Sequence, residues 1–278
     1  MASSSSAFGY LPRTSPVHDL TGAAKLLMTI FASAAVMITY DTRFLVFLIL
    51  ASSAIFRLSK VKFAEIRAVF LFIVTLMAVN TVILYLFSPE EGVRIYGSRH
   101  EMFRFTVRYT VTQEQLFYLL NVVLKYGATL PIALVFLLTT EPSEFASSLN
   151  QIGVDCRIAY AVALALRYIP DIQRDFNEIS QAQQARGCDL SRRTGLRRRI
   201  RNVSAILFPL IFSSLERIET ISSAMELRGF GKHRKRTWYR SRSFRAADFA
   251  AVAACAGLVG VSICLTIVNG GRFYNPFR

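Results

Sequence analysis

The stretch ETISSAMELRGFG, residues 219–231, places an apolar helical stripe directly before an arginine and two glycines. Met225 and Arg228 fall on one face, because residues three apart are neighbours on a helix surface. The stretch EISQAQQARGCD, residues 178–189, ends in the same way at Arg186. The sequence therefore predicts two helices that each end on Arg-Gly, with their arginines 42 residues apart.

Each Arg-Gly ending has two interpretations. A glycine just past a helix can supply the left-handed residue that ends it, and an arginine in the last turn complements the negative helix end. Alternatively, a guanidinium at the apolar edge of a helix end suits insertion into an acidic, partly dry groove, where bidentate pairing with a carboxylate is strong. One ending alone favours the structural interpretation. Two matching endings make docking on an acidic partner an equal alternative.

The composition predicts a membrane protein. Of 278 residues, 53% are hydrophobic, yet the formal net charge is +15. Apolar runs and arginines occupy different parts of the chain, unlike the mixed surface of a soluble domain. Four blocks (24–40, 68–88, 115–138 and 247–268) have about the length, roughly 17–25 residues, that crosses a bilayer as a helix. A shorter block, 44–56, would cross only if tilted or mismatched. We expect an all-α membrane protein with about five transmembrane helices.

The distribution of basic residues predicts the orientation. Arg57, Lys60 and Arg67 lie between the second and third blocks, and the segment 140–246 is rich in lysine and arginine. Both regions are expected on the cytoplasmic side, which places the N-terminus inside and the C-terminus outside. The expected divisions are an N-terminal tail (1–22), transmembrane helices 1–4 (23–139) with an outer loop (89–113), a cytoplasmic domain (140–246), and the last transmembrane helix with the C-terminus (247–278).

The outer loop is expected to contain a β-hairpin. The segment RFTVRYTVT (104–112) alternates apolar and polar residues, with Phe105, Val107 and Tyr109 on one face. Such alternation is typical of a half-buried strand. Together with VRIYG (93–97) and the turn-like residues that follow, it predicts a small extracytoplasmic hairpin.

The cytoplasmic segment is predicted to be helical. EPSEFASSLNQIG (141–153) has a proline near its start and a glycine as a stop, as in a short amphipathic helix. Two long helices follow, 157–187 and 196–229, and each contains an apolar centre and one proline, Pro170 or Pro209. Internal prolines kink helices, so these are either static kinks or hinges.

The two endings carry Ala185-Arg186-Gly187 and, after Ala224-Met225-Glu226, Leu227-Arg228-Gly229. With these signatures the chain resembles the transmembrane T component of energy-coupling factor (ECF) transporters, the family that includes the cobalt-transporter subunit CbiQ. Supporting stretches are GYLPRTSPVHDL followed by AKLL (9–27), TTEPSEF (139–145), ALRYIPDI (165–172) and SLERIETISSAMELRGFG (214–231). Leu227 departs from the small residue that is usual at its position.

The resemblance implies a membrane scaffold with a helical coupling domain in a prokaryotic plasma membrane. In the family this domain docks on two ABC-type ATPases and carries a membrane-embedded S component. The S component binds the cargo, here expected to be a vitamin or related micronutrient, with cobalt or nickel ions as the other candidates. Arg186 and Arg228 would enter grooves on the ATPases, and Gly187 and Gly229 would end the helices.

Further roles follow from the same resemblance. The residues expected to shape the ATPase contact are Ala182, Ala185, Met225 and Glu226. The apolar centres around 158–169 and 205–212 would hold the S component. Pro170 and Pro209 become candidate hinges.

The chain lacks the sequence features of an enzyme. It contains no G-x-x-x-x-G-K-[ST], and the GK at 231–232 is followed by histidine, so it lacks a phosphate-binding loop. ATP and Mg²⁺ are therefore expected in the partner ATPases, with no cofactor bound here. His18, His100 and His233 lie far apart in the predicted topology, and the four cysteines form no CxxC pair. No metal or catalytic site is expected.

Two basic runs, 192–201 and 231–240, are expected to contact anionic lipid. Lysine and arginine clusters just inside a membrane bind anionic head groups. Nucleic-acid binding is not expected, because no folded domain presents the runs.

A conventional permease is the alternative function. Such a protein would line its own substrate path with polar side chains from its spans, for which Thr75, Asn80 and Thr81 are the candidates. Lys125 stands out as an ionisable residue inside a predicted span. It is a candidate partner contact or a lysine that reaches the membrane surface.

Overall fold

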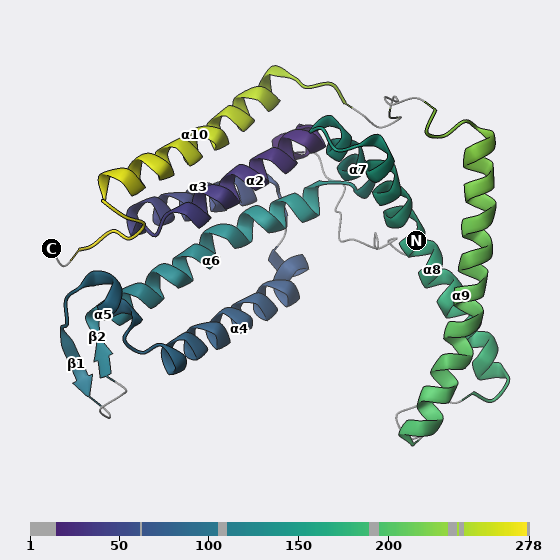
Figure 1. Cartoon of the computed structure of the whole chain (residues 1–278), viewed down its shortest axis with the longest axis horizontal. Helices are drawn as coiled ribbons and strands as arrows, with labels where there is room; N and C mark the ends of the chain where they lie inside the picture. Colours follow the sequence, from purple (N-terminus) through teal and green to yellow (C-terminus); the bar gives the residue numbers. More distant parts are fainter. Residues whose placement is uncertain are drawn as a thin grey trace. The chain divides into compact units, whose positions relative to one another are not determined.

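The computed structural model describes residues 15–61, 63–104, 110–188, 195–232, 238 and 242–276. They form two compact units, which we describe separately. The membrane unit contains Ser15 to Glu141 and Arg242 onward, and the α7–α9 unit contains Pro142 to Trp238. The helices of the membrane unit are α1 (Pro16–Asp19), α2 (Gly22–Ile38), α3 (Thr42–Leu58), α4 (Phe63–Phe87), α5 (Glu91–Tyr96), α6 (Gln113–Thr139) and α10 (Ala246–Val268) (Figure 1).

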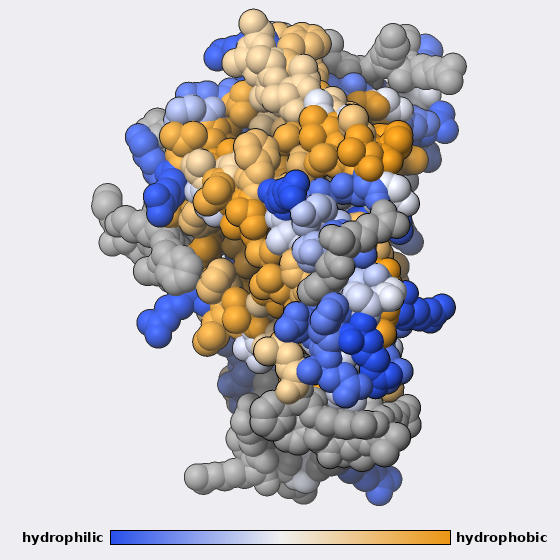
Figure 2. All heavy atoms as spheres, turned by 90° about the vertical axis from the view of Figure 1, so that its left-hand side faces the viewer, coloured by the Kyte–Doolittle hydropathy of each residue, from blue (hydrophilic) through white to orange (hydrophobic). Residues whose placement is uncertain are grey.

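The long apolar helices confirm the prediction of an all-α membrane protein. Three helices are long and apolar enough to cross a membrane among the described residues: Ile66–Phe87 of α4, all of α6 and all of α10. The helices α2 and α3 have 17 residues each. The block 24–40 in α2 was predicted to be long enough to span, whereas only the block 44–56 in α3 was predicted to be shorter than a span. Hydrophobic side chains cover much of the face shown in Figure 2, as an apolar solvent requires.

The core of the membrane unit lies where α2 and α3 meet α6. α2 packs against α6 and α10, and α3 packs against α6. The buried cluster consists of Ala35, Val36, Phe44, Leu45, Leu48 and Ala128. Small residues such as Ala35 and Ala128 allow close approach of helices in a membrane, where van der Waals packing drives association. The three central helices are therefore held by close packing.

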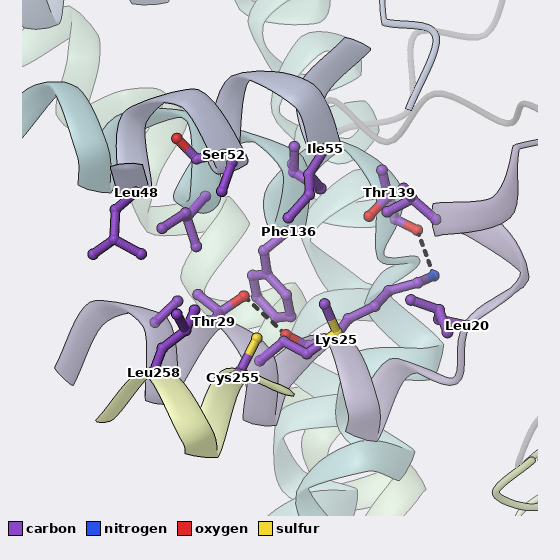
Figure 3. Close-up of a pocket in the computed structure, with 16 residues that line it drawn as sticks. Leu20, Lys25, Thr29, Leu48, Ser52, Ile55, Phe136, Thr139, Cys255 and Leu258 are labelled. Atoms are coloured by element: carbon purple, nitrogen blue, oxygen red, sulfur yellow. Dashed lines mark hydrogen bonds between the residues drawn. The ribbon is translucent and has the colours of Figure 1, made fainter. Parts of the chain in front are cut away.

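Buried polar groups join the helix ends of this unit. The ammonium of Lys25, on α2, donates hydrogen bonds to the carbonyl oxygens of His18 (3.2 Å) and Thr139 (3.0 Å). One carboxylate oxygen of Asp248, on α10, accepts the backbone N–H of Thr21 at 2.9 Å. These bonds pair backbone groups at helix ends, where hydrogen-bond partners within the same helix are missing. Beside Lys25 lies a cavity of about 70 Å³, lined mostly by apolar side chains (Figure 3).

The outer loop differs from the prediction in its first half. The segment VRIYG was expected as a strand, but its first four residues belong to helix α5, which Gly97 ends with a φ of 70°. The physical reason is a tertiary contact with α6. The Gln115 side chain accepts the backbone N–H of Gly92 at 2.7 Å and donates to the Ser88 carbonyl at 3.2 Å. A side-chain amide from α6 thus replaces the strand partner and holds a helical turn.

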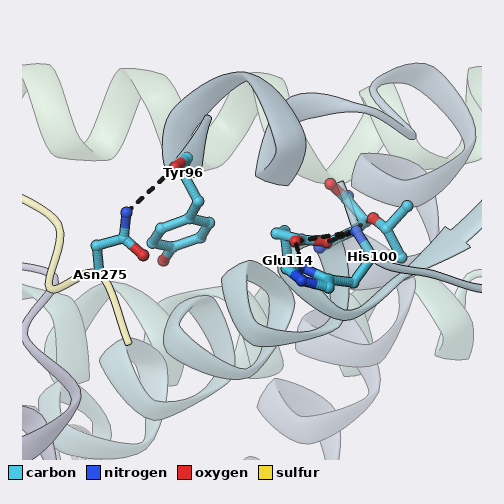
Figure 4. A network of polar contacts seen from close by, with 6 residues as sticks. Tyr96, His100, Glu114 and Asn275 are labelled. Carbon is cyan, nitrogen blue, oxygen red and sulfur yellow. Dashed lines mark hydrogen bonds and ion pairs between the residues drawn. The ribbon is translucent and has the colours of Figure 1, made fainter. Parts of the chain in front are cut away.

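A short hairpin does follow α5, but the prediction of one strand over 104–112 is wrong, because Arg104 pairs with Thr110 and the two residues belong to opposing strands. Strands β1 (Glu101–Arg104) and β2 (Thr110–Thr112) pair antiparallel, with Glu101 opposite Thr112. The predicted apolar face at Phe105, Val107 and Tyr109 lies outside the described residues. The buried carboxylate of Glu114 accepts a hydrogen bond from the ring Nδ1–H of His100, with 2.6 Å between the two atoms (Figure 4). This bond joins the start of the hairpin to α6.

Figure 4 also shows Tyr96 beside Asn275. The Asn275 side-chain amide donates to the Tyr96 carbonyl at 3.1 Å and joins the C-terminal segment to α5. Burial raises the pKa of the Tyr96 hydroxyl, because the charged form loses hydration.

The α7–α9 unit consists of three helices: α7 (Pro142–Gln151), α8 (Cys156–Ala185) and α9 (Leu196–Leu227). The predicted limits of all three are confirmed to within two residues. Pro170 and Pro209 lie inside α8 and α9, and both helices continue through them. The two long helices run antiparallel and cross (Figure 1).

The segment after α9 packs against the beginning of α8. The Phe230 and Tyr160 rings lie 4.7 Å apart between centroids. The indole N–H of Trp238 donates to the Asn150 side chain at 3.2 Å. These contacts hold residues that follow α9 against α7 and the beginning of α8.

Candidate docking site at two helix ends

The end of α8 forms a Schellman motif with Arg186 as its C-cap. The Cys188 N–H donates to the Gln183 carbonyl at 3.0 Å, and the Gly187 N–H donates to the Gln184 carbonyl at 2.9 Å. This pair of bonds satisfies the last carbonyl groups of the helix and requires a left-handed residue after the cap. Gly187 supplies it with a φ of 86°.

The end of α9 repeats this motif with Arg228 as its C-cap. The Phe230 N–H donates to the Met225 carbonyl and the Gly229 N–H donates to the Glu226 carbonyl, both at 2.9 Å. Gly229 has a φ of 67°. The sequence prediction that a glycine ends each helix in the left-handed conformation is therefore confirmed.

The two arginines have almost the same backbone conformation. Arg186 has φ −84° and ψ 8°, and Arg228 has φ −82° and ψ 6°. Both side chains are exposed, and none of the ion pairs among the described residues involves either of them. Two exposed guanidinium groups therefore occupy equivalent positions at the ends of the two helices.

The residues around the arginines are also accessible. Ala182 and Ala185 on α8 are exposed, as are Glu226 and Leu227 on α9. Leu227 is 90% exposed, so its larger side chain adds an apolar contact surface next to Arg228. Met225 is half-buried and lines a hollow between the helices.

The hollow between α8 and α9 has a volume of about 320 Å³. It is lined by Leu164, Tyr168 and Ile172 from α8 and by Ser214, Arg217, Ile218, Ile221, Ser222 and Met225 from α9. The guanidinium of Arg217 lies 2.6 Å from the carboxylate of Asp175. The sequence analysis missed this pair, although its residues are 42 apart, as the two terminal arginines are.

α9 also presents apolar side chains that the structure leaves exposed. They recur at helical spacing and are Ile200, Val203, Leu207, Phe208, Ile211, Phe212, Leu215 and Ile218. Phe212 is 66% exposed and Phe208 is 60% exposed. Patches of this kind mark contacts with a partner or a membrane.

The other predicted candidates belong to other parts of the helices. Pro170 is half-buried and Pro209 is exposed in the middle of their helices. Lys125, on α6, donates to the Met37 carbonyl at 3.2 Å and lies 3.7 Å above the centroid of the Tyr40 ring. It therefore has partners within the membrane unit.

The described histidines and cysteines do not assemble a metal site. His18 is buried and contacts the Ser15 hydroxyl at 2.7 Å, whereas His100 pairs with Glu114. No group of three potential metal ligands was found within the described ranges. His233 lies outside those ranges, as do residues 192–194 and most of the second basic run.

The chain is similar to known transporter proteins over most of its length. The family model CbiQ, described as cobalt transport protein, matches residues 13–239. The chain is 25% identical to the ECF transporter transmembrane protein EcfT of Exiguobacterium sibiricum, covering 94% of this chain and 98% of that protein. It is 26% identical to EcfT of Thermotoga maritima, covering 95% and 93%, respectively.

A third match is to a larger protein. The chain is 31% identical over 150 residues to a protein of Bifidobacterium longum named as an ABC transporter ATP-binding protein, covering 51% of this chain and 19% of that protein. The matched family model covers most of the chain, including both helix ends, and three of the described helices are long and apolar enough to cross a membrane. The chain therefore belongs to the CbiQ/EcfT family, the transmembrane T components of energy-coupling factor transporters.

Proposed function

We propose that this T component couples two ABC-type ATPases to a membrane-embedded S component that captures a vitamin or related micronutrient. The observation that carries the proposal is the pair of equivalent Arg-Gly helix ends with exposed guanidinium groups. ATP and Mg²⁺ would be used by the ATPases, and this chain would bind no cofactor.

The arrangement of the two ends suits a pair of similar partners. Because α8 and α9 are antiparallel, their C-terminal ends point away from each other on opposite sides of the crossing. Two similar ends in this relation match two similar ATPases related by an approximate two-fold axis. The relative named as an ATP-binding protein contains a segment similar to this chain, which supports a link to an ATPase.

Each guanidinium would enter an acidic groove on one ATPase. Arginine offers a planar fork that can pair with a carboxylate through two hydrogen bonds. Ala182 and Ala185 would let the groove approach the first helix closely, whereas Met225, Glu226 and Leu227 would shape the second contact. The two contacts therefore differ in size and polarity.

The exposed apolar side chains of α9 would hold the S component, together with the apolar centre of α8. This apolar strip includes Leu207, Phe208, Ile211 and Phe212, within or next to the predicted centre at 205–212. Apolar association of this kind is non-directional, so it permits the S component to move while it stays bound. Cobalt or nickel ions remain the alternative cargo to a vitamin.

The same function implies an orientation in the membrane. The N-terminus and the α7–α9 unit would lie in the cytoplasm of a prokaryote, where the ATPases are, and the basic runs would contact anionic lipid. No nucleic-acid partner is proposed.

A conventional permease is less well supported. The hydroxyls of Thr75 and Thr81 donate to carbonyl oxygens of their own helix, at 2.9 Å in each case. The Asn80 side chain accepts the Tyr126 hydroxyl at 3.5 Å. None of these three lines either cavity described above.

Purification of the tagged chain from its native membrane, followed by mass spectrometry, tests the proposal. The expected result is co-purification of two ATPase subunits and one small integral membrane protein. Solute uptake by proteoliposomes that contain this chain alone would contradict it and would favour the permease.

A further inference from the structure

The Asp175–Arg217 ion pair joins α8 to α9 at a particular place in both helices. Arg186 follows Asp175 by eleven residues, and Arg228 follows Arg217 by eleven residues. At 1.5 Å per residue, each arm from the ion pair to its arginine is about 16 Å long. The pair thus lies midway between the two helix ends.

The surroundings of the ion pair make it a directional contact in an otherwise apolar crossing. It is the one ion pair that links α8 to α9 among the residues that the structure describes, with its charged atoms 2.6 Å apart. Its neighbours around the hollow are mainly apolar, including Leu164, Ile218 and Ile221. Apolar contacts alone allow helices to slide and rotate at small cost, whereas a charged pair selects one register.

The exposure of the pair argues against a role in overall stability. The Arg217 side chain is 36% exposed and that of Asp175 is 26% exposed. Ion pairs this accessible contribute little to the free energy of unfolding. Such a pair can contribute little to stability and still affect the positions of the helix ends, because a small rotation at the crossing moves the ends of two rigid helices.

We infer that Asp175 and Arg217 are positioning residues that fix the register and crossing of α8 and α9, and so set the separation of Arg186 and Arg228. The two arms, of about 16 Å each along the helix axes, together span about 33 Å, to which the gap between the two helices adds. The purpose of this spacing, which is to match two ATPase grooves, rests on the proposed function. The effect of the ion pair on the spacing itself does not depend on that function.

Spin labels at Gln181 and Ser223 measure the separation directly. Each position is exposed and lies five residues before its arginine. The four cysteines would be replaced by serine or alanine, and the full chain studied in lipid nanodiscs by double electron–electron resonance. Asp175→Ala is expected to at least double the width of the distance distribution. The charge swap Asp175→Arg with Arg217→Asp is expected to restore it.

A second ion pair in α8 provides a matched control. Arg174 and Asp171 also approach to 2.6 Å, but both belong to the same helix. Asp171→Ala removes a similar exposed pair without affecting the crossing, and the distance distribution should not change. An unchanged distribution in Asp175→Ala, or a swap that fails to restore it, would overturn the inference.

Binding of the purified ATPases separates the two proposals. If the inference and the proposed function both hold, Asp175→Ala weakens binding about tenfold and the charge swap recovers it. If Arg186→Glu with Arg228→Glu leaves binding intact, the proposed function fails, whereas the distance measurement still decides the role of the ion pair.

Discussion

Arg186 and Arg228 occupy the same C-cap position of two antiparallel helices, and each is followed by a glycine in the left-handed conformation. The left-handed conformation favours glycine at both positions, and the two exposed arginines share nearly the same backbone angles. The conformation of the ends and their exposure lead to the predictions for Gly187, Gly229 and Leu227.

Replacing Gly187 and Gly229 with alanine is expected to loosen both helix ends. A Cβ atom at either glycine meets nothing within 4 Å, so the cost comes from the left-handed backbone and is about 1–2 kcal/mol per site. ATPase affinity, measured by titration into nanodiscs, should fall about tenfold for the double variant. Gly195→Ala is the control, because Gly195 has a φ of −56° and a Cβ there also meets nothing. Equal affinity of the double variant and the control would contradict this account.

Leu227→Ala tests the difference between the two helix ends. Leu227 is 90% exposed, so its truncation removes contact surface without creating an internal cavity. The thermal stability of the free protein should stay within about 1 °C, since surface substitutions change stability little. Affinity for the ATPase at the α9 end should fall severalfold, whereas Ala185→Gly at the α8 end should have a smaller effect. A drop in the melting temperature comparable to that of a core variant would show that Leu227 is structural.

Lys25→Met is expected to destabilise the membrane unit. The ammonium group donates to the carbonyl oxygens of His18 and Thr139, and methionine preserves the apolar stem while leaving these acceptors without that donor. The cost is about 1.5–3 kcal/mol, as for hydrogen bonds to charged groups. Thermal unfolding in detergent should show a melting temperature several degrees lower. Arg67→Met, at an exposed position, should unfold like the unmodified protein.

Gly92→Ala and Gly97→Ala separate two reasons for glycine in the outer loop. A Cβ at Gly92 would lie 2.5 Å from the Gln115 backbone nitrogen, so α5 and α6 would have to move apart. A Cβ at Gly97 meets nothing within 4 Å, and only its φ of 70° is unfavourable. The Gly97 variant should lose about 1–2 kcal/mol because of its left-handed backbone, and the Gly92 variant should lose more, up to about 3 kcal/mol. Equal losses would argue against the close packing of α5 on α6.

The sequence was sufficient for features that depend on local patterns. Apolar block length predicted α4, α6 and α10, and the Arg-Gly pattern predicted the ends of α8 and α9 to within two residues. These features depend on residues close together in the chain, where periodicity and helix-ending residues carry the information. The family resemblance came from the same local motifs.

Features that depend on distant residues were missed or predicted wrongly. VRIYG was predicted to be a strand but lies mostly in a helical turn, which is held by hydrogen bonds from Gln115, about twenty residues later. A local sequence pattern contains no information about a contact at that distance along the chain. The Asp175–Arg217 pair was also missed, since it depends on how α8 and α9 cross. Its spacing of 42 residues, shared with the two arginines, was the available signal.

In the proposed function, the two arginines at the helix ends bind the ATPases. The direct measurement is titration of the purified ATPases against Arg186→Glu with Arg228→Glu in nanodiscs, compared with Arg174→Glu with Arg197→Glu. Both pairs change the net charge equally, and all four arginines are exposed. Placing a glutamate in each acidic groove is expected to cost at least about 2 kcal/mol, or about thirtyfold in affinity. This loss is expected only for the first pair of substitutions, with membrane insertion intact. Equal ATPase affinity of the two double variants would show that Arg186 and Arg228 do not bind the ATPases.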